Sequence, residues 1–146
     1  MTVLAGWLMT AASPLLLIGT RKILIAWTLL MAIPILLTAW LRFEGRSNRL
    51  FDFWAVLVSI LMAQNWLAPS GYRVLSFFAL WFAAVALGFY YTSSKVPGKP
   101  GETYRYAAYA SAAALPVVLW NWRLGIPIAV LIQGTPMIYN YLKFHR

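Results

Sequence analysis

The amino-acid sequence predicts an all-α integral membrane protein, a polytopic bundle of about six short transmembrane helices joined by tight hairpins. Its composition is the first reason, since 62% of the residues are hydrophobic and 10% are charged, whereas soluble domains carry about 25% charged residues. The second reason is spacing: a helix of about 20 apolar residues crosses a bilayer core of roughly 30 Å. Three pairs of basic residues enclose stretches of about this length, namely Arg21–Arg42, Arg73–Lys95 and Arg123–Lys143.

The six spans use almost the whole chain, so residues 1–146 are expected to form a single integral membrane domain. The sequence contains no cysteine, which excludes disulfides, thiol nucleophiles and thiolate metal sites. Its formal net charge of +9 would suggest nucleic acid for a soluble protein. Here the cations lie in loops and at span ends, where they set topology and contact anionic lipid headgroups. No nucleic-acid partner is expected.

The first three spans are predicted at Val3–Gly19, Ile23–Leu41 and Phe53–Leu67. The first is interpreted as a retained span because a signal peptide would carry its basic residues before the apolar run. Only residues 20–22 separate the first two spans, which predicts a tight hairpin there. Residues 42–49 form a polar loop rich in turn-forming residues, and residues 68–71 are a turn signal after the third span.

The last three spans are predicted at Val74–Tyr91, Tyr106–Trp120 and Leu124–Leu142. The segment 95–101 contains two prolines and two glycines and is expected to be a non-helical loop in solvent. Residues 121–123 are expected to form the next tight turn. Since the first and fifth spans are short enough to be interfacial or re-entrant, between four and six true crossings are expected.

Orientation follows from the distribution of Lys and Arg. With six spans, eight basic residues lie on one side and four on the other, which places both termini in the cytoplasm and the protein in a cytoplasmic (inner) membrane. The first span taken alone argues for the reverse, because its flanking cations follow it. Tryptophans and tyrosines cluster toward span ends as an aromatic belt: Trp27, Trp40, Trp54, Trp66, Trp120, Trp122, Tyr72, Tyr90, Tyr91, Tyr139 and Tyr141.

The sixth span contains two Gly-x-Pro elements, at 125–127 and 134–136. Proline removes a backbone donor and clashes with the preceding turn, so a kink or break is expected near mid-span. Backbone freed in this way can line a binding site, with polar side chains of the third and sixth spans as candidate substrate-binding residues: Gln64, Asn65, Gln133 and Thr135. The alternative is a packed kink in which Gln133 is hydrogen-bonded to another span.

Residues capable of catalysis are few. The single histidine is His145, and the acidic residues are Glu44, Asp52 and Glu102. A metal site needs convergent ligands, so no metal, cofactor or catalytic residue is expected. In the first polar loop, three arginines surround Glu44 and either balance its charge or grip a phosphate-bearing headgroup or an acidic partner; the candidate docking residues are Arg42, Glu44, Arg46 and Arg49.

Small residues at four-residue spacing open the fifth span. Such residues allow two helix backbones to approach closely, which predicts a packing face, within the subunit or against a partner, that includes Ala107, Ala108, Ser111 and Ala112.

These observations favour a small non-catalytic membrane protein that acts by helix packing, as an accessory or assembly subunit or as an immunity or exclusion factor. Its expected partners are the lipid bilayer, anionic headgroups, and another membrane protein or further copies of itself in a homo-oligomer. One alternative is an oligomeric transporter or channel for a small solute, in which the polar residues of spans three and six converge on one cavity. A second is a small lipid-modifying enzyme using Asp52 or Glu102 at the membrane interface.

Overall fold

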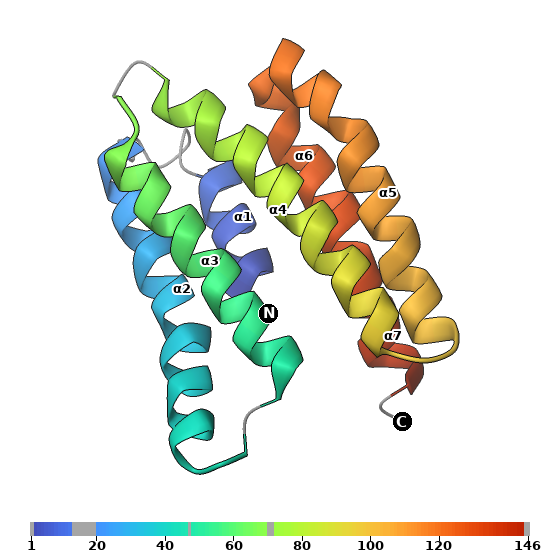
Figure 1. The fold of residues 1–146 in the computed structure, drawn as a ribbon. Helices are drawn as coiled ribbons and strands as arrows, with labels where there is room; N and C mark the ends of the chain where they lie inside the picture. The colour runs from blue at the N-terminus through green and yellow to red at the C-terminus, as the bar shows by residue number, and fades with distance from the viewer. Residues whose placement is uncertain (1, 13–19, 47, 70–71, 145–146) are drawn as a thin grey trace. The chain divides into compact units, whose positions relative to one another are not determined.

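The computed structural model describes residues 2–12, 20–46, 48–69 and 72–144, and these residues are almost entirely helical, with no β-strand among them (Figure 1). The all-α prediction is therefore confirmed for the described chain. Contacts between Cα atoms group the chain into two compact units, Met1–Ala68 and Pro69–Arg146, which we describe separately. Among the described residues, three helices are long and apolar enough to cross a membrane: Arg21–Phe43, Arg49–Leu67 and Val74–Lys95. The single-domain assignment stays a prediction.

Unit 1 contains α1 (Thr2–Ala12), α2 (Thr20–Phe43) and α3 (Arg49–Leu67). Helices α2 and α3 form an antiparallel hairpin, and α1 packs on α2. At 11 residues, α1 is about 16 Å long, which is about half the thickness of a bilayer core. The remainder of the predicted first span, residues 13–19, lies outside the described residues.

The predicted hairpin at residues 20–22 is wrong, because these residues form the first turn of α2. Charged residues mark where a helix leaves the bilayer core, but they do not end it. Lys and Arg are good helix formers, and no glycine or proline interrupts this turn.

The loop between α2 and α3 is fixed at both ends by backbone and side-chain capping. Gly45, with φ of 70°, follows α2 and donates its N–H to Arg42 O, while Arg46 N–H donates to Leu41 O. This pair of bonds is a Schellman motif, which requires a left-handed residue at the position of Gly45. At the other end, Asn48 Oδ1 accepts from the N–H groups of Leu50 and Phe51 and caps α3.

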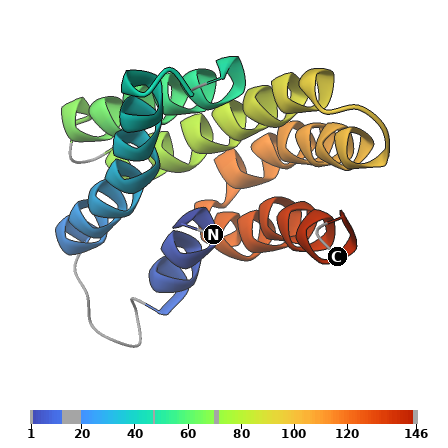
Figure 2. The ribbon, with the colours of Figure 1, turned by 90° about the horizontal axis from the view of Figure 1, so that it is seen from below.

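Unit 2 is built from α4 (Arg73–Lys95), α5 (Lys99–Trp120) and a third helical run that begins after Asn121. That run consists of a 3₁₀ turn, η1 (Trp122–Leu124), followed by α6 (Gly125–Ala129), the π-helical segment η2 (Val130–Gly134) and α7 (Thr135–Phe144). Helix α5 packs along α4 and also contacts the third run, so it lies between them (Figure 2). The predicted turn at 121–123 is confirmed by the end of α5 and the cap at Asn121.

Two expectations for unit 2 need correction. Residues 99–101 are the first turn of α5 and not a loop, so only residues 96–98 connect α4 to α5. Pro100 is tolerated there because the first helical turn has no use for its missing N–H. Gly101 is buried, and a Cβ atom at this position would collide with Val96 O, so only glycine fits.

The sixth span is not broken, since its backbone stays helical from Gly125 to Phe144. The irregularity takes the form of the π-helical segment directly before Pro136. Proline has no N–H for the preceding turn, and a single widened turn of this kind accommodates the defect inside a continuous helix.

Candidate functional site

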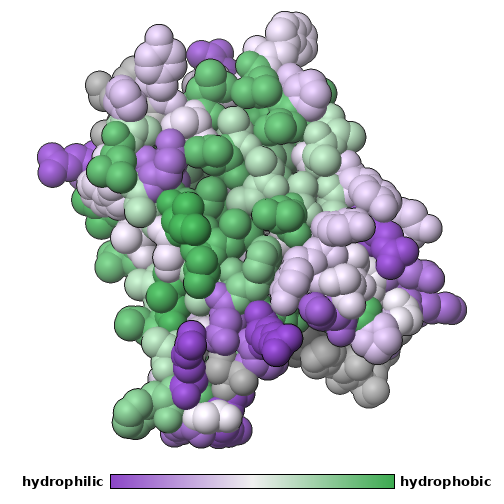
Figure 3. Space-filling model, in the orientation of Figure 1, coloured by the Kyte–Doolittle hydropathy of each residue, from purple (hydrophilic) through white to green (hydrophobic). Residues whose placement is uncertain are grey.

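Large apolar side chains cover much of the outside of the helices. On α2, Leu29 is 65% exposed and Leu36 is 68% exposed, and on η2 Leu131 is 66% exposed. In unit 2, the surface over the middle of α4 is hydrophobic on the face that Figure 3 shows. Exposed apolar area on this scale marks a membrane or protein contact.

The interior of unit 2 is filled by aromatic side chains of α4 that pack against small side chains of its neighbours. Trp81, Phe82 and Phe89 are almost completely buried, and Trp81 stacks on Phe77 with ring centroids 5.8 Å apart. The closeness of this packing is clearest at Gly125, where an added Cβ would lie 2.6 Å from Phe78 Cδ1. The helices of unit 2 therefore fit one another closely.

The predicted packing face of α5 is largely within this interior. Ala107, Ala108 and Ser111 are buried, as are Ala114 and Val118 further along the helix. Ala112 is exposed, because one residue advances the helix by about 100° and turns Ala112 away from the stripe through Ser111. A packing role for Ala112 stays a prediction that requires another molecule.

Gln133 lies in the π-helical segment and is 1% exposed. Its Oε1 accepts a hydrogen bond of 3.1 Å from Trp81 Nε1 on α4, so its side chain links two helices. Thr135, two residues later, is exposed. The other two candidate substrate-binding residues, Gln64 and Asn65, lie on α3 in unit 1; Asn65 is 2% exposed, and the side-chain oxygens of both have no partner among the described residues. The convergence of all four on one cavity stays a prediction.

The arginine loop between α2 and α3 is open to solvent. Arg42, Arg46 and Arg49 are exposed, and one ion pair forms, between Arg46 Nη1 and Glu44 Oε2 at 3.5 Å. An exposed pair of this kind contributes at most about 1 kcal/mol. The structure brings Glu44 and Arg46 together as expected for charge balance. Arg42 and Arg49 are exposed, and docking of a partner or a headgroup there stays a prediction.

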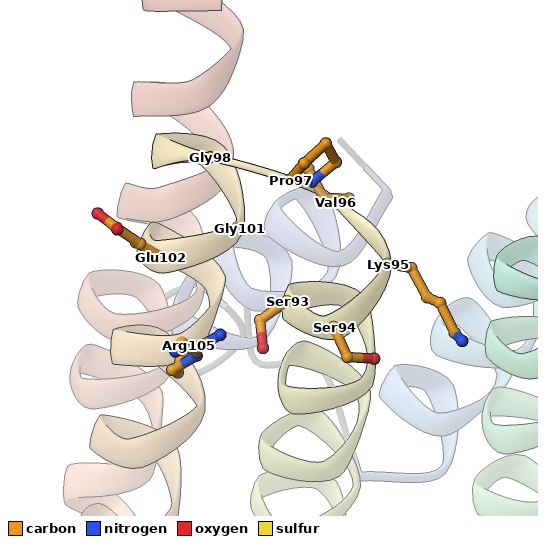
Figure 4. A pocket seen from close by; sticks show the side chains of 9 residues that line it. All are labelled: Ser93, Ser94, Lys95, Val96, Pro97, Gly98, Gly101, Glu102 and Arg105. Atoms are coloured by element: carbon orange, nitrogen blue, oxygen red, sulfur yellow. The ribbon is translucent and has the colours of Figure 1, made fainter.

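A polar pocket at the connection between α4 and α5 was missed by the sequence analysis (Figure 4). Its charged lining residues are Lys95, Glu102 and Arg105, and Ser93 adds a buried hydroxyl. The proline and glycine content of this segment suggested an open loop. The signal that could have revealed the pocket is the pair Gly98 and Gly101, which lets the chain fold back on α5.

The acidic residues do not gather into a site within the described chain. Among the described residues, no group of three His, Cys, Asp or Glu side chains could hold a metal ion. Glu44, Asp52 and Glu102 lie on separate helix ends, and Glu102 lines the α4–α5 pocket; His145 lies outside the described residues. No protein-family model, curated protein or solved structure matches the chain, so its function has to be inferred from its own residues.

Proposed function

We propose that the protein is a small integral membrane protein that acts by helix packing, as an accessory or assembly subunit of a larger membrane complex. The observation that supports this most directly is the buried link between Trp81 and Gln133. The buried amide of the third helical run, Gln133, links two helices, and the exposed apolar side chains are available to lipid and to a partner.

We propose the topology with both termini in the cytoplasm. In unit 1, the arginine loop lies at one end of the α2–α3 hairpin, and Arg21 and Lys22 lie at the other. In unit 2, a weak bond of 3.4 Å from Asn140 Nδ2 to Pro100 O holds the C-terminal part of α7 beside the start of α5. Four basic residues lie near that end of unit 2 and two near the opposite end, which favours placement of the first end in the cytoplasm. The four are Lys95, Lys99, Arg105 and Lys143, and the two are Arg73 and Arg123.

The topology can be tested because the chain has no cysteine of its own. Single variants Arg46→Cys, Pro97→Cys and Asn121→Cys would be treated with a membrane-impermeant maleimide, first in intact cells and then after permeabilisation. We expect labelling of Asn121→Cys in intact cells and labelling of the other two only after permeabilisation. Labelling of Arg46→Cys and Pro97→Cys from outside would reverse the orientation.

The accessory role is tested by purification of the full chain in a mild detergent, with mass measurement of the intact complex. We expect a second membrane protein at fixed stoichiometry, lost when the exposed face of α2 is altered by Leu29→Ser with Leu36→Ser. The matched control alters Leu87 and Leu119, which are exposed on unit 2. A defined homo-oligomer without a second protein would contradict the accessory role.

A transporter or channel is the second candidate, and the π-helical segment favours it, because such segments often occur at functional sites. In that case Gln133 would contact solute and not serve packing alone. Solute flux measured in vesicles that contain the purified protein would then fall with Gln133→Leu. A protein that acts by packing alone is expected to show no solute flux in the same vesicles.

A further inference from the structure

The pocket between α4 and α5 lies within unit 2 and presents one cation to its interior. In Figure 4, the Arg105 guanidinium and the Ser93 hydroxyl point toward each other, whereas the Glu102 carboxylate and the Lys95 ammonium point away. Arg105 forms no ion pair with a described residue. A guanidinium has five N–H donors and no acceptor, so this pocket is equipped to bind an anion.

The walls of the pocket are held by short-range backbone constraints. Gly98 has φ of 71° and ψ of −158°, a region that only glycine adopts readily. The connection then passes so close to α5 that Gly101 has no room for a Cβ atom. Ser93 is buried, with its hydroxyl donating to Tyr90 O at 2.7 Å. The pocket is therefore a fixed feature of the helix ends.

Its surroundings match the headgroup zone of a bilayer. Lys95 Nζ lies 5.5 Å from the centre of the Tyr91 ring, and on α7 Lys143 Nζ donates to Tyr139 Oη at 2.8 Å. Tyrosine and lysine side chains of this kind concentrate at the membrane–water interface. The volume of the pocket, about 490 Å³, accommodates a phosphate group with its glycerol.

We propose that this pocket binds the phosphate group of an anionic lipid headgroup, with the Arg105 guanidinium as the charged hydrogen-bond donor. Guanidinium and phosphate pair through charge-assisted, often bidentate hydrogen bonds. Glu102, at the rim, opposes the anion and limits its affinity. The proposal rests on the membrane insertion proposed above, and it adds a ligand that the packing role does not require.

The test uses the full chain in a neutral detergent, titrated with dioctanoyl phosphatidic acid and, in parallel, with dioctanoylglycerol, which lacks the phosphate. We expect the phosphatidic acid to bind and Arg105→Gln to weaken it about tenfold, through the loss of charge-assisted bonds. Glu102→Gln should strengthen binding about threefold by removing a repelling charge. A gain of this kind cannot arise from misfolding.

Lys99→Gln is the matched control, because Lys99 lies close to Glu102 and Arg105 in sequence, is exposed and does not line the pocket. We expect its effect to stay below about twofold. An equal loss for Lys99→Gln and Arg105→Gln would mean diffuse surface attraction and would overturn the proposal, as would equal binding of dioctanoylglycerol. If inorganic phosphate binds as tightly as the phosphatidic acid, the pocket takes free phosphate and the lipid assignment is wrong.

The membrane proposal and the pocket proposal fail in different ways. Extraction of the wild-type chain from membranes by alkaline carbonate would contradict membrane insertion, and the inorganic phosphate titration would still report on the pocket. If the wild-type chain stays in the membrane and Arg105→Gln binds phosphatidic acid normally, only the pocket proposal is wrong.

Discussion

Helices α2 and α4 have similar lengths, 24 and 23 residues, and both are long and apolar enough to span a membrane. They differ in how many of their residues are buried. In the most apolar part of the candidate spans, 17% of the residues of α2 are buried and 39% of those of α4. Helix α2 buries one large aromatic ring, that of Trp27, and carries aliphatic side chains such as Leu29 and Ile33 on its exposed surface. Helix α4 buries four such rings, those of Phe78, Trp81, Phe82 and Phe89. Hydropathy thus identifies both helices as candidate membrane spans, whereas the number of large rings that each helix buries distinguishes the more closely packed α4 from α2.

The tryptophan hydrogen bonds of the two units also differ in burial. In unit 1, Trp66 Nε1 donates to Thr28 Oγ1 at 3.0 Å in an exposed position. In unit 2, Trp81 Nε1 donates to Gln133 Oε1 at a similar distance of 3.1 Å, but the bond is buried. Because the two hydrogen bonds have similar lengths but differ in burial, variants of the two tryptophans can be compared directly to test the difference between α4 and α2.

The largest effect is expected for Trp81→Ala, compared with Trp40→Ala on α2. Trp81 is 1% exposed and Trp40 is 54% exposed. Truncation of the buried ring leaves a cavity and should lower the free energy of unfolding by about 3–5 kcal/mol, whereas the exposed ring should contribute less than about 0.5 kcal/mol. Loss of helical circular dichroism during denaturation in mixed micelles measures both.

The wild-type chain and Trp40→Ala serve as controls for interfacial anchoring, since Trp40 belongs to the predicted aromatic belt. Equal destabilisation by the two variants would mean that α4 is no more central than α2, and it would remove the contrast between the units.

The sequence predicted the spans well where length and hydropathy decide the answer, as for α2, α3 and α4. It did not predict where α2 begins, because Arg21 and Lys22 mark a membrane boundary and are also good helix formers. It also failed at Lys99–Gly101, since proline and glycine were taken as helix breakers without regard to their place in a first turn.

The candidate sites were predicted less well, for a related reason. Gln133 was predicted as a site residue because it is a polar residue in a span with two Gly-x-Pro elements, but its partner Trp81 is 52 positions away in sequence. The α4–α5 pocket depends on the directions of Arg105 and Glu102, which are three residues apart and still point differently in Figure 4. Such directions are set by packing, which single-sequence patterns do not contain.

An intermediate effect is expected for Gly125→Ala in unit 2, compared with Gly6→Ala in unit 1. In both cases the new Cβ would lie 2.6 Å from an aromatic ring, that of Phe78 or that of Trp27. Phe78 is buried and stacks on Trp122, with ring centroids 6.0 Å apart, so it has little room to move. Overpacking there should cost about 1–3 kcal/mol of global stability.

For Gly6→Ala we expect a local change instead, because α1 has 11 residues and contributes little helix stability of its own. Amide hydrogen exchange should become faster in α1 while the unfolding midpoint of the chain stays the same. A drop in that midpoint equal to the one for Gly125→Ala would show that α1 is as integral to unit 1 as α6 is to unit 2.

The smallest effect is expected for the pair Trp81→Phe and Trp66→Phe, which keep an aromatic ring and delete the indole N–H. Hydrogen bonds between membrane helices contribute about 0.6 kcal/mol on average and up to about 1.7 kcal/mol. The buried bond to Gln133 should lie toward the upper value, because Trp81→Phe removes a hydrogen bond that is shielded from water. The exposed bond to Thr28 should lie near zero, since water or headgroups replace it. The double variant Trp81→Phe with Gln133→Leu separates this bond from ring size. A cost equal to the sum of the single variants would mean that the two side chains do not stabilise each other, and the contact between α4 and η2 would then depend on packing and not on this bond.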